Sequence, residues 1–428
     1  MASRRSARPE GVKLSQIFVQ DALDNGLVVL GERMPWLGSV AVRLFVPAGS
    51  AREPEGRFGI ARVLADLIEH GAGERTHREI VEALDFLGVS FDVGGGTYSL
   101  IVKAAMPADK LPEVLPILAD LVRRPHLPDE DLDDVRRSAL QDLRALDDDP
   151  GGRMSERLRL NTFGPVFGRS DLGRLEDLEA LTGDDVRAFY RDNVGSTESI
   201  FSIAGQFDWP AVRDQVRTLF GDWGPVDRPQ LPTAPGTWES CHITHQSAQT
   251  HIGLSWPSVP LSDDDSLNAR GILGILGGGM SSRLFEEVRE RRGLCYSVDA
   301  GYSTLRDRAC GLATCGTTAE RAQESLDTML AEIGKLADGF SDEELARLKT
   351  QLRSGLIAQQ ESCHSRASAL AANWIHYGRL RTMDEISARI QALTRESLAG
   401  HLERYPATAF SIVTLGPEPL EQTRGVSR

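Results

Sequence analysis

A glycine-rich turn followed by a charged segment stands at residues 277–297, which read GGGMSSRLFEEVRERRGLCYS. The charged segment is typical of a surface helix, and Gly293 is well placed to end it, because glycine tolerates the left-handed conformation common at helix C-termini. Alternation after it predicts one face of a strand, formed by Leu294, Tyr296 and Val298. We therefore expect Arg289 and Tyr296 to point to one site. The residues alone leave open a structural role, with Tyr296 half-buried in the core.

The chain around this segment is a duplication. Three short matches recur in the same order and at nearly constant spacing: residues 127–132 with 340–345, 180–182 with 392–394, and 201–203 with 410–412. Any one of them could arise by chance, whereas three in order indicate a repeated unit of about 212 residues. Two such units account for nearly all of the 428 residues.

Both units contain strand-like and helix-like segments. Residues 40–46 and 99–104 are rich in apolar and β-branched residues, as strands are. Residues 111–122 carry an apolar stripe at helical spacing despite Pro116, and residues 341–344 form a capping box that opens a later helix. We expect an α+β fold of two tandem homologous domains, each a mostly antiparallel sheet packed with helices.

A proline-rich segment separates the two units. Four prolines lie within residues 224–236, and they predict an extended, semi-rigid connector. The predicted division is a disordered leader at 1–15, an N-terminal domain at 16–223, a linker at 224–240 and a C-terminal domain at 241–428.

The composition is that of an acidic protein, with 48 Lys and Arg against 62 Asp and Glu and a net charge of −14. Such a chain is not expected to bind a nucleic acid or an anionic membrane surface. No apolar run reaches the roughly 18–20 residues of a membrane helix, and the basic start does not continue into a secretory signal. Five scattered cysteines do not suggest a disulfide framework. We therefore expect a cytoplasmic protein.

The segment at 277–297 closely resembles the second-half signature of the insulinase/pitrilysin metallopeptidase family, which includes the mitochondrial processing peptidases. The resemblance rests on the Gly-Gly-Gly-x-Ser-Ser-Arg-Leu turn and on an Arg seven residues before the Tyr of Gly-Leu-x-Tyr. With the duplicated halves and the linker, it extends over nearly the whole chain. It implies that Arg289 and Tyr296 hold the substrate main chain and stabilise the tetrahedral intermediate. The implied substrate-binding residues of the turn are Gly278, Gly279, Ser281 and Ser282.

The same resemblance implies a zinc motif that this chain lacks. The family places His-x-x-Glu-His on the first helix of its first half and a further Glu ligand on a later helix. Aligned on the flanking glycines, these positions fall on Arg62, Ala65 and Asp66, with Asp142 at the distal one. The cationic Arg62 would repel zinc, and Ala65 has no group to accept a proton. We expect salt bridges between Arg62 and the two carboxylates, and no metal in this chain.

Two other arrangements resemble metal sites. Residues 66–70 read Asp-x-x-Glu-His, but this register rotates the ligand set by about 40° around the helix, and we expect Glu69 and His70 on a solvated face near the helix end. Cys241 and His242 stand close to residues 247–256, the expected first strand of the second unit. Neighbouring residues on a strand point to opposite faces, so these two are not expected to share a metal.

These patterns predict a zinc-less subunit of a heterodimeric pitrilysin-type metallopeptidase that hydrolyses peptides. A homologous partner would carry His-x-x-Glu-His and the zinc, while this chain would supply Arg289 and Tyr296. Residues 88–100 would provide an edge strand or a cleft wall for the substrate. Two alternatives stay open. One is a non-catalytic scaffold like the core subunits of respiratory complexes, and the other is a self-contained peptidase using residues 66–70.

Overall fold

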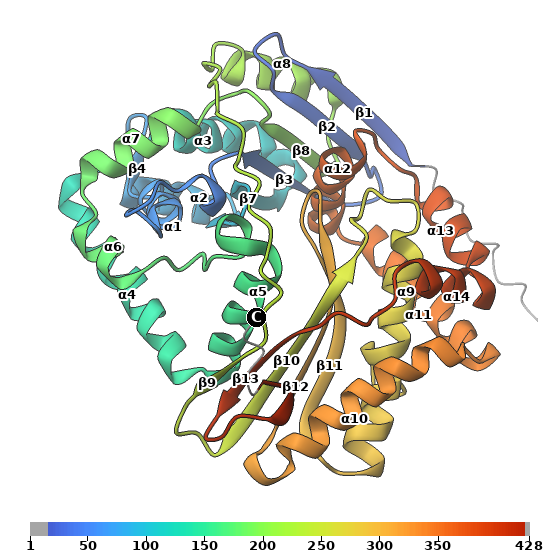
Figure 1. Ribbon diagram of the computed structural model, residues 1–428. Helices are drawn as coiled ribbons and strands as arrows, with labels where there is room; N and C mark the ends of the chain where they lie inside the picture. Colours follow the sequence, from blue (N-terminus) through green and yellow to red (C-terminus); the bar gives the residue numbers. More distant parts are fainter. Residues whose placement is uncertain (1–15, 424–428) are drawn as a thin grey trace, which may run out of the picture.

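The computed structural model describes residues 16–423 and contains two large β-sheets with helices packed around them (Figure 1). The first sheet has the strand order β1-β2-β8-β3-β7-β6 and the second has the order β11-β12-β10-β13-β9. Neighbouring strands are antiparallel except for one pair in each sheet, β2 with β8 and β13 with β9. The predicted α+β class, with a mostly antiparallel sheet in each half, is confirmed. The predicted leader at 1–15 lies outside the described residues.

The strands of the first sheet all precede residues 224–240, and those of the second all follow them. The first sheet comprises β1(Ile17–Ala22), β2(Val28–Arg33), β3(Ser39–Val46), β6(Ser90–Gly95), β7(Leu100–Pro107) and β8(Ile200–Gly205). The second comprises β9(Cys241–Thr244), β10(Gln249–Ser258), β11(Cys295–Thr304), β12(Ala309–Thr318) and β13(Ser411–Gly416). A small hairpin joins β4(Gly71–Ala72) to β5(Arg75–Thr76). The expectation that the second unit starts with a strand at 247–256 is wrong, because β9 precedes that strand and pairs with β13.

Seven helices of the first half belong with the first sheet: α1(Ile60–Leu67), α2(His77–Phe86), α3(Leu111–Arg123), α4(Asp129–Ala145), α6(Leu175–Ala180), α7(Gly183–Asn193) and α8(Trp209–Phe220). Their apolar faces and the sheet form one continuous core. Helix α3 runs through Pro116 without ending, and its apolar stripe is fully buried. Burial of that stripe offsets the backbone hydrogen bond that proline cannot make.

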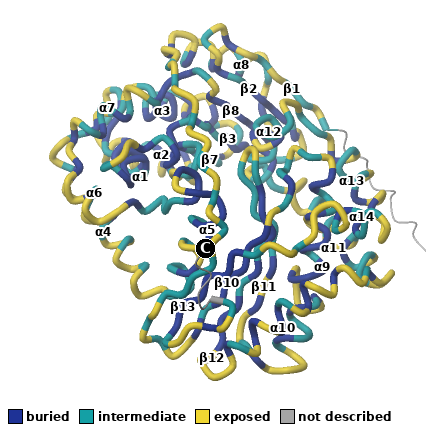
Figure 2. The backbone as a smooth tube through the Cα atoms, viewed as in Figure 1, coloured by how far each residue is buried: buried dark blue, intermediate teal, exposed yellow. Residues whose placement is uncertain are grey.

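Five helices of the second half pack with the second sheet: α9(Ser266–Gly277), α10(Ala322–Gly334), α11(Asp342–Gln360), α13(Met383–Ala392) and α14(Arg395–Arg404). The predicted capping box opens α11, because the Ser341 hydroxyl accepts from Glu344 N–H and the Glu344 carboxylate accepts from Ser341 N–H. The central strands β8 and β13 are buried along their whole length (Figure 2). No helix within residues 16–423 is long and apolar enough to cross a membrane.

Two helices pack across the duplication. Helix α5(Pro150–Phe167) belongs to the first half in sequence but lies against β10 and β13, and α12(Cys363–Tyr377) belongs to the second half but lies against β2, β3 and β8 (Figure 1). Met154 and Leu158 of α5 are buried with Val413 and Leu415. Each sheet is therefore covered on one face by a helix from the other half of the sequence, so neither half buries its sheet alone.

A buried ion pair joins the halves at the second of these contacts. Arg366 on α12 and Glu32 on β2 lie 2.7 Å apart and are 1% and 4% exposed. Gln16 donates a further hydrogen bond of 2.7 Å to the Glu32 carboxylate. Both charges are thus compensated inside the protein, as buried charges must be.

Candidate functional site

The glycine-rich turn begins where α9 ends against β11. At Gly277 a Cβ atom would lie 2.0 Å from the backbone nitrogen of Ala300, so only glycine fits this contact. Of the residues expected to contact substrate, Gly278, Gly279 and Ser281 are exposed. Ser282 is buried, and its hydroxyl has no hydrogen-bond partner in the described chain. The turn thus presents a short run of exposed backbone.

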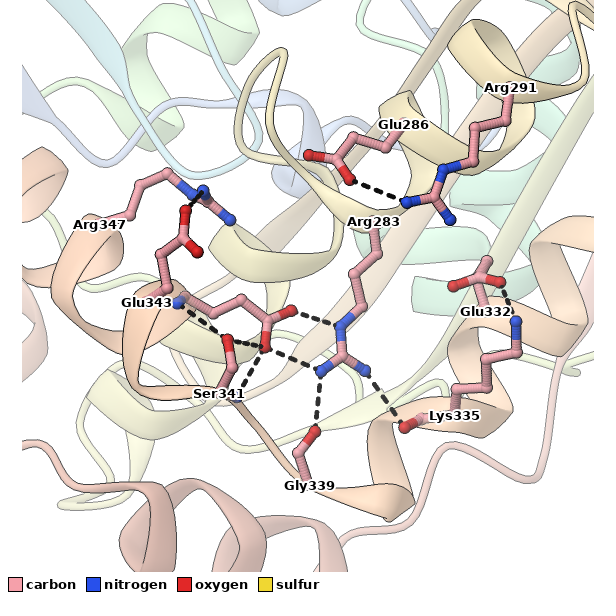
Figure 3. A network of polar contacts seen from close by, with 10 residues as sticks. Arg283, Glu286, Arg291, Glu332, Lys335, Gly339, Ser341, Glu343 and Arg347 are labelled. Carbon is pink, nitrogen blue, oxygen red and sulfur yellow. Dashed lines mark hydrogen bonds and ion pairs between the residues drawn. The ribbon is translucent and has the colours of Figure 1, made fainter.

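Arg283 ties the end of this turn to the start of α11 (Figure 3). Its guanidinium lies 2.7 Å from Oε1 of Glu344 and donates to the carbonyl oxygens of Lys335 and Gly339 at 3.1 and 2.8 Å. Burial alone would raise the pKa of Glu344, but hydrogen bonds from Arg283 and Ser341 lower it to about 2. The Arg of the turn is therefore a structural anchor, with each of its three guanidinium nitrogens donating to a nearby acceptor.

The charged segment after the turn is helical, but it is wound more loosely than an α-helix. Residues Phe285–Arg291 form a π-helix, a rare form that occurs often at functional sites. Gly293, with φ +60°, ends it, and its N–H donates to the Arg289 carbonyl oxygen at 3.1 Å. The prediction that Gly293 terminates this helix is confirmed.

A β-bulge decides where Tyr296 points. The pairing of β11 with β12 shifts between Cys295 and Ser297, so Tyr296 has no partner in the ladder. Leu294 and Val298 are buried, whereas Tyr296 is 80% exposed. The expected alternation of these three residues on one face is therefore wrong, and so is a half-buried core tyrosine. The bulge breaks the two-residue period and aims the ring outward, as bulges near functional sites often do.

Arg289 and Tyr296 are brought together, as expected, and a third residue joins them. The Arg289 guanidinium carbon lies 5.4 Å from the centre of the Tyr296 ring and 4.7 Å from that of Phe285. Phe285 was not predicted as a site residue, although its spacing of four residues before Arg289 is a signal that one helix face holds both. The Arg289 guanidinium thus contacts two aromatic rings, one of which is the exposed phenol of Tyr296.

The residues at the zinc-motif positions also meet, around α1. Arg62 forms a short ion pair with Asp142 of α4 and lies 3.9 Å from Oδ2 of Asp66. Burial, and then the neighbouring Asp142, raise the pKa of Asp66, while Arg62 lowers it. Arg62, Ala65 and Asp66 line a cavity of about 260 Å³ together with residues 93–96 at the end of edge strand β6. The expected salt bridges are present.

This donor set does not fit a zinc ion. Zinc sites use imidazole, thiolate or carboxylate ligands, and here a cation stands between the two carboxylates. Within residues 16–423, no group of three or more His, Cys, Asp or Glu side chains is placed to hold a metal. No catalytic step of this chain can therefore be assigned to a metal at α1.

The shifted motif at 66–70 is broken by the end of the helix. Helix α1 stops at Leu67, so Glu69 and His70 lie in the following turn, and both are partly buried. Both residues lie near the helix end, as expected, but their side chains are only partly solvated. Burial, and then Asp66, raise the pKa of Glu69 to about 7, although a hydrogen bond from Val93 N–H of β6 opposes this. His70 faces Asp131 at 3.1 Å.

Cys241 and His242 of β9 are part of the second sheet. Cys241 and His242 are consecutive residues of that strand, and His242 Nδ1 lies 2.9 Å from the Thr414 hydroxyl on β13. Cys241 packs instead with the cluster around Met154. The two side chains thus have separate surroundings.

Known proteins and family models match this chain along most of its length. Residues 28–166 match the family model described as Insulinase (Peptidase family M16), and residues 180–352 match the model described as Peptidase M16 inactive domain. An uncharacterized zinc protease of Rickettsia felis is 26% identical over 95% of this chain and 99% of that protein. One of Streptomyces coelicolor is 28% identical over 92% of this chain and 88% of that protein.

Two solved structures have the same fold. A peptidase M16 inactive domain from Pseudomonas fluorescens superposes with a TM-score of 0.86 at 21% identity, over 94% of this chain and 99% of that one. A protease from Helicobacter pylori gives 0.85 at 18% identity, over 95% and 100%. The duplicated halves, the glycine-rich turn with its Arg–Tyr pair and these matches agree, and the chain belongs to the insulinase family, peptidase family M16.

Proposed function

We propose that this chain is the zinc-less subunit of a heterodimeric M16 metallopeptidase and that it supplies Arg289 and Tyr296 to the zinc site of a homologous partner. The observation that carries the proposal is the exposure of Tyr296, which is 80% and is caused by a bulge beside Arg289. A residual core tyrosine would be buried. The absence of a zinc-compatible donor set at α1 among the described residues supports the need for a partner.

The two side chains suit the stabilisation of a peptide bond under attack. The Tyr296 phenol can donate a hydrogen bond to the carbonyl oxygen as negative charge develops on it. Arg289 keeps its N–H donors available, because no hydrogen bond or ion pair engages its guanidinium within the described chain. It can therefore orient a substrate carbonyl. The partner supplies the zinc and the catalytic base.

The substrate is an extended peptide that lies along a sheet edge. Strand β6 is an edge strand of the first sheet, so its outer backbone groups face away from β7. Main-chain hydrogen bonds to such an edge give affinity with little dependence on sequence. The turn residues Gly278, Gly279 and Ser281 are exposed and offer further backbone contacts, whereas the buried Ser282 supports the turn from within. We place the complex in the cytoplasm, in keeping with five free cysteines.

The test compares the pure chain with the complex formed on co-expression with a zinc-bearing homologue. The pure chain should not cleave peptides. In the complex, Tyr296→Phe should lower kcat roughly 10²- to 10³-fold, the cost of one oxyanion donor elsewhere, with little change in KM. Tyr405→Phe is the matched control, since Tyr405 is 39% exposed and lies next to His401.

Two results would contradict the proposal. One is chelator-sensitive cleavage by the pure chain. The other is wild-type turnover by the Tyr296→Phe complex, which would favour a scaffold with no catalytic contribution.

A further inference from the structure

The guanidinium of Arg289 is held by rings instead of by acids. Its central carbon lies 4.7 Å from the Phe285 ring centre and 5.4 Å from that of Tyr296. Glu287 of the same helix is engaged elsewhere, since it pairs with Arg291 and Arg292 at 3.1 and 3.0 Å. Stacking on a ring face uses no N–H donor, because the donors lie in the guanidinium plane.

The backbone around this stack is fixed on both sides. Two residues before Phe285, Arg283 is locked to Glu344 and to two carbonyl oxygens of the loop before α11 (Figure 3). After the π-helix, Gly293 reverses the chain, and the bulge returns Tyr296 to the Arg289 side chain. Phe285 is only partly buried, and the Arg289 guanidinium lies over its ring.

We infer that Phe285 is a positioning residue for Arg289. Its ring contacts the guanidinium together with the Tyr296 ring and leaves the donors free for a substrate carbonyl. This inference rests on the proposed function for its role in turnover, but the placement of Arg289 by Phe285 is a property of the isolated chain.

The first experiment therefore uses the isolated full chain. The Nε–Hε NMR resonance of Arg289, identified by its loss in Arg289→Ala, should carry an upfield ring-current shift. Phe285→Leu should move it toward the position of an unstacked arginine, and Phe285→Tyr should restore it. Phe86→Leu is the matched control, because Phe86 is 89% exposed on α2 and lies in the other half. An unmoved resonance in Phe285→Leu overturns the inference.

The second experiment uses the complex. Phe285→Leu should lower kcat roughly three- to fivefold with little change in KM, the expected effect of losing one cation–π contact, and Phe285→Tyr should recover it. If Arg289→Ala lowers turnover but Phe285→Leu does not, the inference is overturned. If Arg289→Ala also leaves turnover unchanged, the proposed function fails, and the resonance alone decides whether Phe285 positions the guanidinium.

Discussion

Two arginines mark the difference between the halves. Arg62 on α1 lies between the carboxylates of Asp66 and Asp142, whereas Arg289 before β11 lies between the rings of Phe285 and Tyr296. Carboxylates consume the donors of a guanidinium, and rings leave them available. The same residue type therefore neutralises charge in one half and can bind a ligand in the other.

The comparison also explains why the halves differ in exposure at these sites. At α1 Arg62 offsets part of the charge of its two acids, with side-chain exposures of 27% for Arg62 and 37% and 49% for the acids. At the bulge, the Tyr296 side chain faces solvent at 80% exposure beside a guanidinium that no acid engages within the described chain. The first region is self-sufficient, and the second is incomplete without a ligand or partner.

The largest expected effect comes from restoring the zinc motif. The variant Arg62→His/Ala65→Glu/Asp66→His/Asp142→Glu replaces the cation and its acids by two imidazoles and a carboxylate ligand, plus a base. We expect about one zinc per chain after metal loading, held by a tetrahedral site of the kind that three such ligands and a water form.

Elemental analysis after gel filtration measures this, with the unaltered chain as the control that should hold no zinc at α1. If the unaltered chain bound one zinc per chain and lost it on Asp66→Ala, the conclusion that the residues at α1 do not fit a metal would be wrong.

The next largest effect, on the stability of the fold, is expected from removing a third arginine. Arg366 is paired with Glu32 in the interior, at 1% and 4% exposure, and joins the two halves. Arg366→Ala leaves the Glu32 carboxylate buried without its cation, which typically costs about 3–5 kcal/mol of unfolding free energy. Chemical denaturation followed by circular dichroism measures the loss.

Arg379→Ala is the matched control for that variant. Arg379 and Glu385 are paired at 58% and 33% exposure, so the variant should lose less than about 1 kcal/mol. Equal losses in the two variants would show that the buried pair does not hold the halves together.

Local signals in the sequence predicted much of this fold. The strands β3 and β7, the capping box of α11 and the helix end at Gly293 are each encoded by nearby residues. The exchange of α5 and α12 between the halves was not predictable in this way. It depends on which sheet face is left uncovered after the local helices have packed, and no short segment records that.

In the candidate site, too, some features could be predicted from the sequence and others could not. Arg289 and Tyr296 were predicted as a pair, and the meeting of Arg62 with Asp66 and Asp142 followed from the alignment. The direction of the Tyr296 side chain could not be predicted, because one extra residue in a strand reverses the direction of every later side chain without changing the composition. The end of α1 at Leu67 was missed for a similar reason, since no glycine or proline marks it until Gly71.

A smaller effect concerns pH and the start of α1. Glu53 is 5% exposed and accepts a hydrogen bond from Ala61 N–H, and burial raises its pKa to about 7. The folded state therefore holds a proton that the unfolded state releases near the ordinary glutamate value. Unfolding free energy should fall as pH rises from about 4.5 through about 7.

Glu53→Gln should remove that part of the pH dependence, giving a gain over the wild type at pH 8 of up to a few kcal/mol. Stability measured by denaturation at pH 5 and pH 8 decides the matter. A wild-type profile as flat as that of the Gln variant would contradict a buried proton at this position.

The smallest expected effect comes from removing Arg62. It shows whether Arg62 acts by neutralising the carboxylates at α1 or by linking α1 to α4. Arg62 spans α1 and α4, as a metal would, but its pairs are partly exposed, so Arg62→Ala should cost no more than about 1 kcal/mol. Removing the cation also removes the group that lowers the Asp66 pKa. The Asp66 carboxylate is then less easily ionised in the folded state, so the loss should be greater at pH 8, where Asp66 must be ionised, than at a pH low enough to protonate it. A pH-independent loss above about 2 kcal/mol would instead mean that Arg62 holds the two helices together by packing.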